Sequence, residues 1–509
     1  MKDSRTNNTL RNMSVGVVGR LISLLLPFVI RTIILHKLGA DYAGLGSLFT
    51  SILQVLSVAE LGFSSAIIFS MYKPVAQGDK EEVRALLTLY RWIYVIVGMV
   101  ILVAGLILAP FLRYFIKGGY PADINLYVLY GIYLANTVIS YFCFGYKNVL
   151  LTVHQRQDVV SAIDIGINVG RSIIQIVVLM ICSNYYAYII WMPIFTLVSN
   201  LSVNAITKRK YPELVCCGKV DKQKLSAISN QIKGVALGKF SLIARNTFDS
   251  IIISSLLGLT AVAMYSNYYF IFSSVGAMLV VILQAMSASV GNSIATETIE
   301  KNLRDHHKFD FYFSWIVSWC TVCLVCLYQP FMKLWAGEEL MFPYHTMILF
   351  CVYFYVNQLS QVRSIYSEAA GMWWEFRYLT LAEMIANLTL NILLGWWLGA
   401  DGIILATIIT AFFSSFMGIT RITFKKFFHA SPREYYMNAV IYAGVTLAAC
   451  IISGVLCSAV RAEGFGKLIL CGIICCAVPN LIFLAIYGSI GKYRAYIMGV
   501  KGFIVRRIK

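Results

Sequence analysis

The chain is an almost unbroken series of apolar runs, each about as long as a helix that crosses a lipid bilayer, roughly 20 residues. We predict fourteen such spans, at residues 13–35, 43–70, 86–112, 124–146, 159–182, 187–207, 236–257, 261–290, 310–329, 345–366, 377–398, 403–420, 437–458 and 468–490. Hydrophobic residues make up 59% of the chain and charged residues 13%, which leaves no polar stretch long enough for a separate soluble domain. The sequence therefore predicts an all-α polytopic membrane protein with about 14 transmembrane helices.

One kind of short turn recurs along the chain. Leu38-Gly39-Ala40-Asp41 follows the first span, Leu257-Gly258-Leu259-Thr260 the seventh and Leu398-Gly399-Ala400-Asp401 the eleventh. The glycine can end one helix in the left-handed conformation, and the Asp or Thr two residues later can cap the next helix. Recurrence after the first and seventh spans predicts two pseudo-symmetric six-helix bundles, related as parallel repeats. The predicted domains are an N-terminal six-helix lobe (1–207), a basic cytoplasmic linker (208–235), a C-terminal six-helix lobe (236–436), and two additional helices with a basic cytoplasmic tail (437–509).

The chain has a net charge of +18, and 36 of its 42 lysines and arginines lie between the predicted spans. Thirty of them fall in segments on one side of the membrane and six in the loops on the other side, if the spans alternate in direction. The positive-inside rule then places both termini in the cytoplasm. Membrane topology thus accounts for most of the charge, and the sequence predicts no nucleic-acid partner.

The thirteen cysteines and six histidines form no ligand pattern that we can recognise. Cys320, Cys323 and Cys326 repeat every third residue in the ninth span, but the histidines are dispersed in loops or at span ends. Because thiolates are costly in hydrocarbon, we interpret these cysteines as small packing residues. Residues 234–239 resemble a nucleotide-binding P-loop only superficially, since the glycines are too close together and Phe240 replaces the Ser or Thr. The sequence predicts no catalytic residues, no metal and no cofactor.

Polar residues in several predicted spans recur at helical spacing, which is typical of helices that line an aqueous cavity. Three spans show the pattern: the fifth with Asp164, Asn168, Arg171 and Gln175, the tenth with Asn357, Gln361, Ser364 and Glu368, and the eleventh with Glu383, Asn387 and Asn391. Single charges add to these faces, namely Arg20 and Arg31 in the first span, Glu60 in the second, and Arg245 and Asp249 in the seventh.

Four of these residues are arginines placed where lipid would reject them: Arg20, Arg31, Arg171 and Arg245. In one interpretation they hold helices together, with Arg171 pairing with Asp164 and Arg245 with Asp249. In the other they face a water-filled central cavity with a positive inner surface. Each buried arginine costs roughly 3 kcal/mol on insertion scales, so four that serve only as helix staples are less expected. A positive cavity suits a large anionic substrate, because guanidinium groups bind phosphate oxygens in bidentate fashion.

Four stretches carry a family resemblance: residues 12–31, the Leu38 to Leu45 turn, Glu60-Leu61-Gly62-Phe63, and Arg245-Asn246-Thr247-Phe248-Asp249. With the order of the spans, they resemble the Wzx-type flippases of O-antigen and capsular polysaccharide repeat units. These belong to the polysaccharide transporter family of the multidrug/oligosaccharidyl-lipid/polysaccharide (MOP) exporter superfamily. The resemblance implies transfer of a polyprenyl-pyrophosphate-linked oligosaccharide from the cytoplasmic to the periplasmic leaflet of the bacterial inner membrane by alternating access. It also implies coupling to a proton or sodium ion, with membrane lipids and other polysaccharide-assembly proteins as partners.

For such a flippase we expect Arg31, Arg171 and Arg245 to contact the pyrophosphate and sugar, and Arg20 to lie nearer the cytoplasmic mouth. Asn168 and Gln175 complete the expected substrate-binding set. We expect Glu60, Asp164, Asp249 and Glu383 either to bind the coupling ion or to pair with the arginines. Two other functions within the superfamily stay open, a multidrug or small-cation antiporter and a flippase for the peptidoglycan precursor lipid. A scaffold without transport activity would leave the aligned polar faces unexplained.

Overall fold

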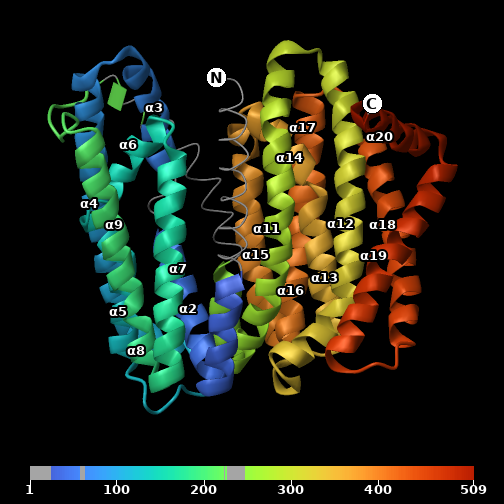
Figure 1. Cartoon of the computed structure of the whole chain (residues 1–509), viewed down its shortest axis with the longest axis horizontal. Coiled ribbons are helices and arrows are strands. Elements are labelled where there is room, and N and C mark those ends of the chain that lie inside the picture. The colour runs from blue at the N-terminus through green and yellow to red at the C-terminus, as the bar shows by residue number, and fades with distance from the viewer. Residues whose placement is uncertain (1–24, 58–62, 223, 226–227, 229–246, 509) are drawn as a thin grey trace. The chain divides into compact units, whose positions relative to one another are not determined.

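The computed structural model describes residues 25–57, 63–222, 224–225, 228 and 247–508. Within these ranges the chain consists of helices joined by turns and bends (Figure 1). None of the described residues is assigned to a strand. It divides into two compact units, Met1–Ala263 and Met264–Lys509. The boundary between the units falls within helix α11. The all-α prediction is confirmed.

The first unit begins with a helix at residues 25–37. Its further helices are α2 (Ala40–Leu56), α3 (Phe63–Gln77), α4 (Lys80–Leu108), η2 (Ala109–Phe115), α5 (Leu126–Phe142), η3 (Gly145–Lys147), α6 (Asn148–Val153), α7 (Gln157–Cys182), α8 (Tyr185–Ile189), α9 (Trp191–Lys210) and the segment Thr247–Leu257. The fourth predicted span is bent by 49° between Phe142 and Gly145. Phe144, inside this break, has a φ of 63°.

The second unit takes up most of α11 (Leu259–Thr296). The helices that follow are α12 (Ile299–Trp335), η4 (Glu338–Leu340), α13 (Tyr344–Leu359), α14 (Gln361–Ala369), α15 (Trp373–Leu398), α16 (Ala400–Thr410), the π-helix η5 (Ala411–Ile419), α17 (Thr420–Lys426), α18 (Arg433–Ser458), α19 (Gly464–Ser489) and α20 (Gly491–Ile508). Helices α18 and α19 pack against α12 (Figure 1). Trp315 of α12 donates from Nε1 to Asn480 Oδ1 of α19 at 2.8 Å.

Nine of the described helices are long and apolar enough to cross a membrane, or ten if the bent pair counts as one span. This composition confirms a multi-pass membrane protein. The count of fourteen stays a prediction, because the first, second and seventh predicted spans run into residues outside the described ranges. The tenth predicted span consists of two shorter helices, α13 and α14, separated at Ser360.

The glycines of the three turns all have a positive φ. Gly39, Gly258 and Gly399 have φ values of 112°, 94° and 63°, which side chains other than glycine rarely tolerate. The predicted caps at Asp41 and Asp401 are wrong, because α2 and α16 begin directly after their glycines and have no side-chain cap. Thr260 likewise lies inside the first turn of α11, and its Oγ1 donates to Asp41 Oδ1 at 2.8 Å. These side chains therefore join different helices instead of capping their own.

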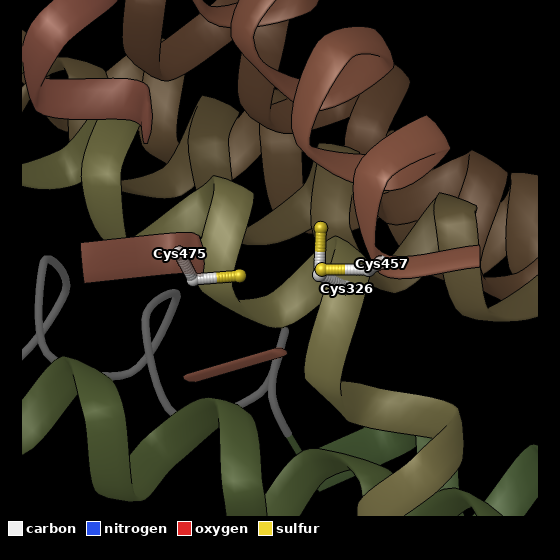
Figure 2. A group of neighbouring side chains, drawn as sticks. All are labelled: Cys326, Cys457 and Cys475. Atoms are coloured by element: carbon white, nitrogen blue, oxygen red, sulfur yellow. The ribbon is translucent and has the colours of Figure 1, made fainter. Parts of the chain in front are cut away.

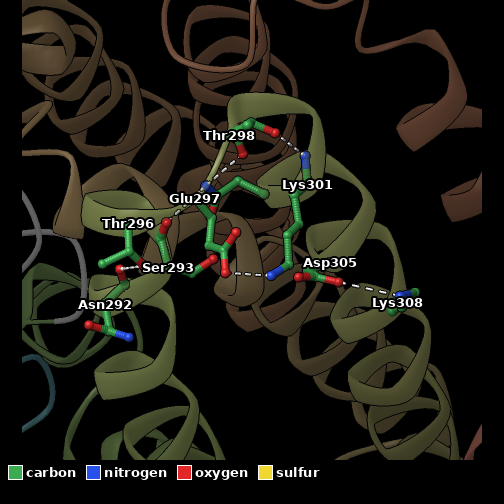
Figure 3. Close-up of polar contacts among 9 residues, drawn as sticks. Asn292, Ser293, Thr296, Glu297, Thr298, Lys301, Asp305 and Lys308 are labelled. Carbon is green, nitrogen blue, oxygen red and sulfur yellow. Dashed lines mark hydrogen bonds and ion pairs between the residues drawn. The ribbon is translucent and has the colours of Figure 1, made fainter.

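The connection between α11 and α12 is much shorter than the apolar windows predict. Residues 291–309 were expected to be a cytoplasmic loop, but α11 ends at Thr296 and α12 begins at Ile299. Figure 3 shows the contacts that close this turn: Thr298 Oγ1 accepts from the Lys301 amide at 3.4 Å, and Lys301 Nζ pairs with Glu297 at 2.6 Å. The basic residues of this segment therefore lie on helical extensions.

The described part of the basic linker packs against α3 and α4. Leu214 and Ile228 are buried in a core that includes Ile67 and Leu86. Lys80 Nζ lies 2.8 Å from Glu213 Oε2, and Lys224 Nζ lies 2.5 Å from Glu82 Oε1. The hydrogen bond to Glu82 raises the pKa of Lys224. This part of the linker is thus held on the first unit.

Candidate functional site

Arg31 is half-buried on the helix at 25–37 and donates hydrogen bonds to two other helices. Its Nη1 donates to Ser47 Oγ of α2 at 3.2 Å, and its Nη2 donates to the carbonyl oxygen of Ala263 in α11 at 3.3 Å. Both acceptors are neutral. These two bonds therefore orient the guanidinium group without neutralising its charge.

Three tyrosines lie within electrostatic range of the Arg31 guanidinium: Tyr133 of α5, and Tyr185 and Tyr188 of α8. The hydroxyl oxygens of Tyr133 and Tyr185 are 3.0 Å apart and hydrogen-bond to each other. A Cβ atom on Gly46 would come within 2.7 Å of the Tyr185 hydroxyl and 2.9 Å of the Tyr133 hydroxyl. The missing side chain at Gly46 thus makes room for this phenol pair, one residue before Ser47.

Arg171 is half-buried on α7 and lies within electrostatic range of the same Tyr188. Its Nη2 donates to Asn168 Oδ1 at 2.9 Å, one turn earlier on the helix. Its Nε is buried and has no hydrogen-bond partner among the described residues. Such a buried donor is costly unless something satisfies it, so Arg171 retains capacity to bind a further acceptor.

Gln175 is buried one turn beyond Arg171 and donates from Nε2 to the carbonyl oxygen of Tyr188 at 3.2 Å. The short helix α8 that carries Tyr188 begins at Asn184, whose Oδ1 accepts from the Ala187 amide at 3.0 Å. Gln175 therefore holds α7 to α8. Tyr188 thus accepts from Gln175 through its carbonyl oxygen and has both Arg31 and Arg171 within electrostatic range.

Asp164 lies on the exposed part of α7, two turns before Arg171. Across the described residues these two side chains form neither an ion pair nor a hydrogen bond with each other. Asp249 is buried in the Thr247–Leu257 helix, with 1% of its surface exposed. Three further predicted residues, Arg20, Glu60 and Arg245, lie outside the described ranges, so the predicted Arg245–Asp249 pair stays a prediction.

Glu383 is buried on α15 in the second unit and accepts from Ser415 Oγ of η5 at 3.2 and 3.3 Å. Asn387, one turn on, donates from Nδ2 to Thr407 Oγ1 at 3.1 Å and to Thr410 Oγ1 at 3.2 Å, both on α16. Asn391 Nδ2 donates to Asn387 Oδ1 at 3.3 Å. The polar face of the eleventh span therefore hydrogen-bonds to its neighbours along α16 and η5.

A further polar face, which the sequence did not predict, lies on α12. Five buried residues follow one another at steps of four: Asn302, His306, Asp310, Ser314 and Ser318. The His306 ring lies among the rings of Tyr366, Phe424, Phe428 and Tyr435, and its nitrogens have no hydrogen-bond partner among the described residues. The sequence contains this spacing, but the residues before 310 are too polar for an apolar span. Asn302 and His306 therefore fall outside the predicted span that contains Asp310, Ser314 and Ser318.

Arg363 of α14 is another buried charge in the second unit. Its residue exposure is 2%, its Nη2 donates to Ser364 Oγ at 3.2 Å, and its Nε has no partner within the described part of the chain. Glu368, Glu383 and Tyr435 lie within electrostatic range of its guanidinium.

Comparison with protein-family models finds no match, and neither does comparison with curated proteins. Solved structures do match. An inward-facing multidrug-resistance MATE family transporter of the MOP superfamily has a TM-score of 0.62 and 15% identity, over 80% of this chain and 98% of that one. The lipid II flippase MurJ in an inward closed conformation has a TM-score of 0.61 and 12% identity, over 93% of this chain and 99% of that one. The eukaryotic MATE transporter AtDTX14 has a TM-score of 0.53 and 12% identity, over 82% and 96%. The chain therefore has the fold that these MATE transporters and MurJ share.

Proposed function

We propose that this protein is a flippase that moves a polyprenyl-pyrophosphate-linked oligosaccharide, such as an O-antigen or capsule repeat unit, from the cytoplasmic to the periplasmic leaflet. The observation that carries the proposal is that Arg31 and Arg171, from different helices, share Tyr188 as a neighbour, and that the Arg171 Nε has no hydrogen-bond partner among the described residues. Two guanidinium groups in one place match the charge of a pyrophosphate better than that of an organic cation.

In this proposal Arg31 and Arg171 neutralise the pyrophosphate, so that the head group can cross while its lipid tail stays in the bilayer. The Arg171 Nε supplies a free donor, and Asn168 and the phenols of Tyr133 and Tyr185 supply polar groups for sugar hydroxyls. Gln175 fixes Tyr188. Arg20 and Arg245 complete the proposed set of substrate-binding arginines.

The proposed transport is secondary and coupled to a proton or sodium ion, with no chemical conversion of the substrate. The candidates for the coupling ion are Glu60, Asp164, Asp249 and Glu383. The α12 face adds Asp310, because a buried ionisable residue in a membrane helix is a functional candidate by default. We place the protein in the bacterial inner membrane with both termini cytoplasmic, where membrane lipids and polysaccharide-assembly proteins are its expected partners.

A flippase for the peptidoglycan precursor lipid is the second candidate. It is supported by the share of this chain that aligns with each structure. The match with MurJ covers 93% of this chain, whereas the matches with the two MATE transporters named above cover 80% and 82%. The lipid II named for MurJ and the proposed substrate are both lipid-linked, so the same arginines would serve either. A multidrug or small-cation antiporter is less favoured, because a cationic substrate would be repelled by Arg31 and Arg171.

The test is transport by the full-length protein in proteoliposomes. Three substrates are compared: a pyrophosphate-linked oligosaccharide, the peptidoglycan precursor lipid and an organic cation. We expect Arg31→Ala and Arg171→Ala to abolish movement of the oligosaccharide lipid, while Arg31→Lys and Arg171→Lys retain part of it. Arg156→Ala is the control, because Arg156 is already paired with Asp158 at 3.0 Å on an exposed surface. Full activity in both alanine variants, or transport of the cation alone, would overturn the proposal.

A further inference from the structure

Three cysteines from three different helices meet in the second unit. Cys326 lies on α12, Cys457 near the end of α18 and Cys475 on α19, and their sulfur atoms all lie within 4.8 Å of one another (Figure 2). All three residues are buried, with 8%, 5% and 0% of their surfaces exposed. We call them the thiol trio.

The spacing of the thiol trio fits a three-coordinate metal ion. A metal–sulfur distance near 2.3 Å places three ligands in a plane about 4.0 Å from one another. Since the present separations reach at most 4.8 Å, each pair of sulfurs closes by about 1 Å or less. Rotation of cysteine side chains covers that distance, and the helices need no rearrangement.

The donor atoms decide which ion fits. The trio contains sulfur only, with no histidine or carboxylate among its members. Mg²⁺ and Ca²⁺ require oxygen ligands, and structural Zn²⁺ sites almost always have four ligands. Thiolates favour soft ions, and Cu(I) is the soft physiological ion that accepts three sulfur ligands.

From this geometry we propose that Cys326, Cys457 and Cys475 form a binding site for one Cu(I) ion. On binding, the three thiols lose their protons, because the thiolate is the form of cysteine that ligates metal ions. The three thiolates and the +1 ion give a site with a net charge of −2, and three protons leave. No atom changes oxidation state.

The consequence would be a cross-link between helices. Two contacts already hold these elements together: Trp319 of α12 donates from Nε1 to the Cys475 carbonyl at 2.8 Å, and Cys471 Sγ lies 3.8 Å from the Cys457 carbonyl. A bound ion would tie α18 and α19, the two helices beyond the second predicted lobe, to α12. This role is separate from the arginine site and does not depend on the proposed function.

The experiment titrates full-length, detergent-solubilised, reduced protein with Cu(I) held by a chromophoric competing chelator. We expect one Cu(I) per chain and a higher thermal unfolding midpoint when it is bound. Cys326→Ser, Cys457→Ser and Cys475→Ser should each lose stoichiometric binding and the thermal shift. The control is Cys351→Ser, which removes an equally buried thiol on α13 whose sulfur contacts Met347 Sδ at 3.6 Å. The control variant should bind like the wild type.

Alanine variants of the trio repeat the measurement, so that a serine variant which fails to fold does not decide the outcome. The proposal is overturned if the wild type binds no Cu(I), or if it binds no better than the triple alanine variant. It is equally overturned if Cys351→Ser loses as much binding as the trio variants, or if protein purified without reductant carries a disulfide between two of the three cysteines. Zn²⁺ is the comparison ion, and stronger binding of Zn²⁺ than of Cu(I) would also refute it.

Discussion

Gly44 of α2 lies against the backbone at the start of α11, and replacing it with alanine should separate the two helices. A Cβ atom there would come within 2.3 Å of the Leu259 carbonyl oxygen and 2.9 Å of the carbonyl carbon. Non-bonded heavy atoms are comfortable at roughly 3.5 Å or more. The obstructing atoms belong to the backbone, so no side-chain rotation relieves the overlap, and α2 has to move by about 1 Å.

The magnitude follows from the overlap and from the bonds beside it. Overpacking of this kind typically costs about 1–3 kcal/mol. The displacement also strains the Thr260–Asp41 hydrogen bond of 2.8 Å and the Arg31–Ala263 bond of 3.3 Å, each worth about 1 kcal/mol. The higher helix propensity of alanine raises the free energy of unfolding by about 0.5–1 kcal/mol and so offsets part of this loss. We therefore expect Gly44→Ala to lower the free energy of unfolding by about 2–3 kcal/mol.

The assay is equilibrium unfolding of the full-length protein in detergent, followed by tryptophan fluorescence. Gly131→Ala is the matched control, because Gly131 lies in α5 of the same unit and a Cβ atom there would meet nothing within 4 Å. The control should leave stability unchanged or raise it by about 0.5–1 kcal/mol. Equal stability of Gly44→Ala and the wild type would refute the reasoning. So would equal destabilisation by both glycine substitutions.

Two further predictions test other parts of the molecule. Asn387→Ala should lower the free energy of unfolding by about 1–3 kcal/mol, since it leaves the buried hydroxyls of Thr407 and Thr410 without their amide partner. The control is Thr389→Ala on the exposed side of α15, which should change the free energy of unfolding by no more than about 0.5 kcal/mol. Equal effects of the two substitutions would contradict a stabilising role for the hydrogen bonds between Asn387 and α16. Burial and a 2.5 Å hydrogen bond to Asp123 raise the pKa of Tyr42, just ahead of the second predicted span, to about 12. Because the folded-state pKa lies above the ordinary value near 10, this stabilisation is complete below pH 10 and is lost as the pH rises from about 10 to about 12. An alkaline absorbance titration of wild type minus Tyr42→Phe should show one phenol ionising near pH 12, and ionisation near pH 10 would contradict it.

The helices were largely predictable because burial in lipid imposes one requirement on every span, a continuous apolar length. A search for apolar stretches does not detect a helix that is polar in composition but buried within the protein. The first turns of α12 illustrate the failure: residues 299–309 are too polar for an apolar window, yet Asn302, His306 and Asp310 are buried. A window average records composition, whereas the step of four records which side chains share a face. The spacing of the polar residues predicts that the helix continues before residue 310, whereas the average composition predicts that it starts there.

Contacts between residues far apart in the sequence could not be predicted either. Asp41 was predicted to cap its own helix, but it accepts from Thr260, 219 positions along the chain. The thiol trio likewise draws one residue from each of three helices, so no local spacing marks it. The ladder of Cys320, Cys323 and Cys326 is visible in the sequence, and only its last member belongs to the trio. The sequence shows which side chains can form hydrogen bonds or bind an ion, but their partners depend on which helices the fold places next to each other.

Aligned polar residues are therefore insufficient evidence that a helix lines an aqueous cavity. The stripe on α15 and the stripe on α7 have the same spacing, but they differ in how their hydrogen bonds are satisfied. Asn387 is 1% exposed and both its described donor bonds end on α16, so its stripe holds two helices together. Arg171 is half-buried, its described hydrogen bond ends on Asn168 of its own helix, and its Nε has no partner among the described residues. An unsatisfied donor on a charged side chain is the feature that a binding site needs and a helix staple lacks, which is why the proposed substrate contacts lie on α7 and not on α15.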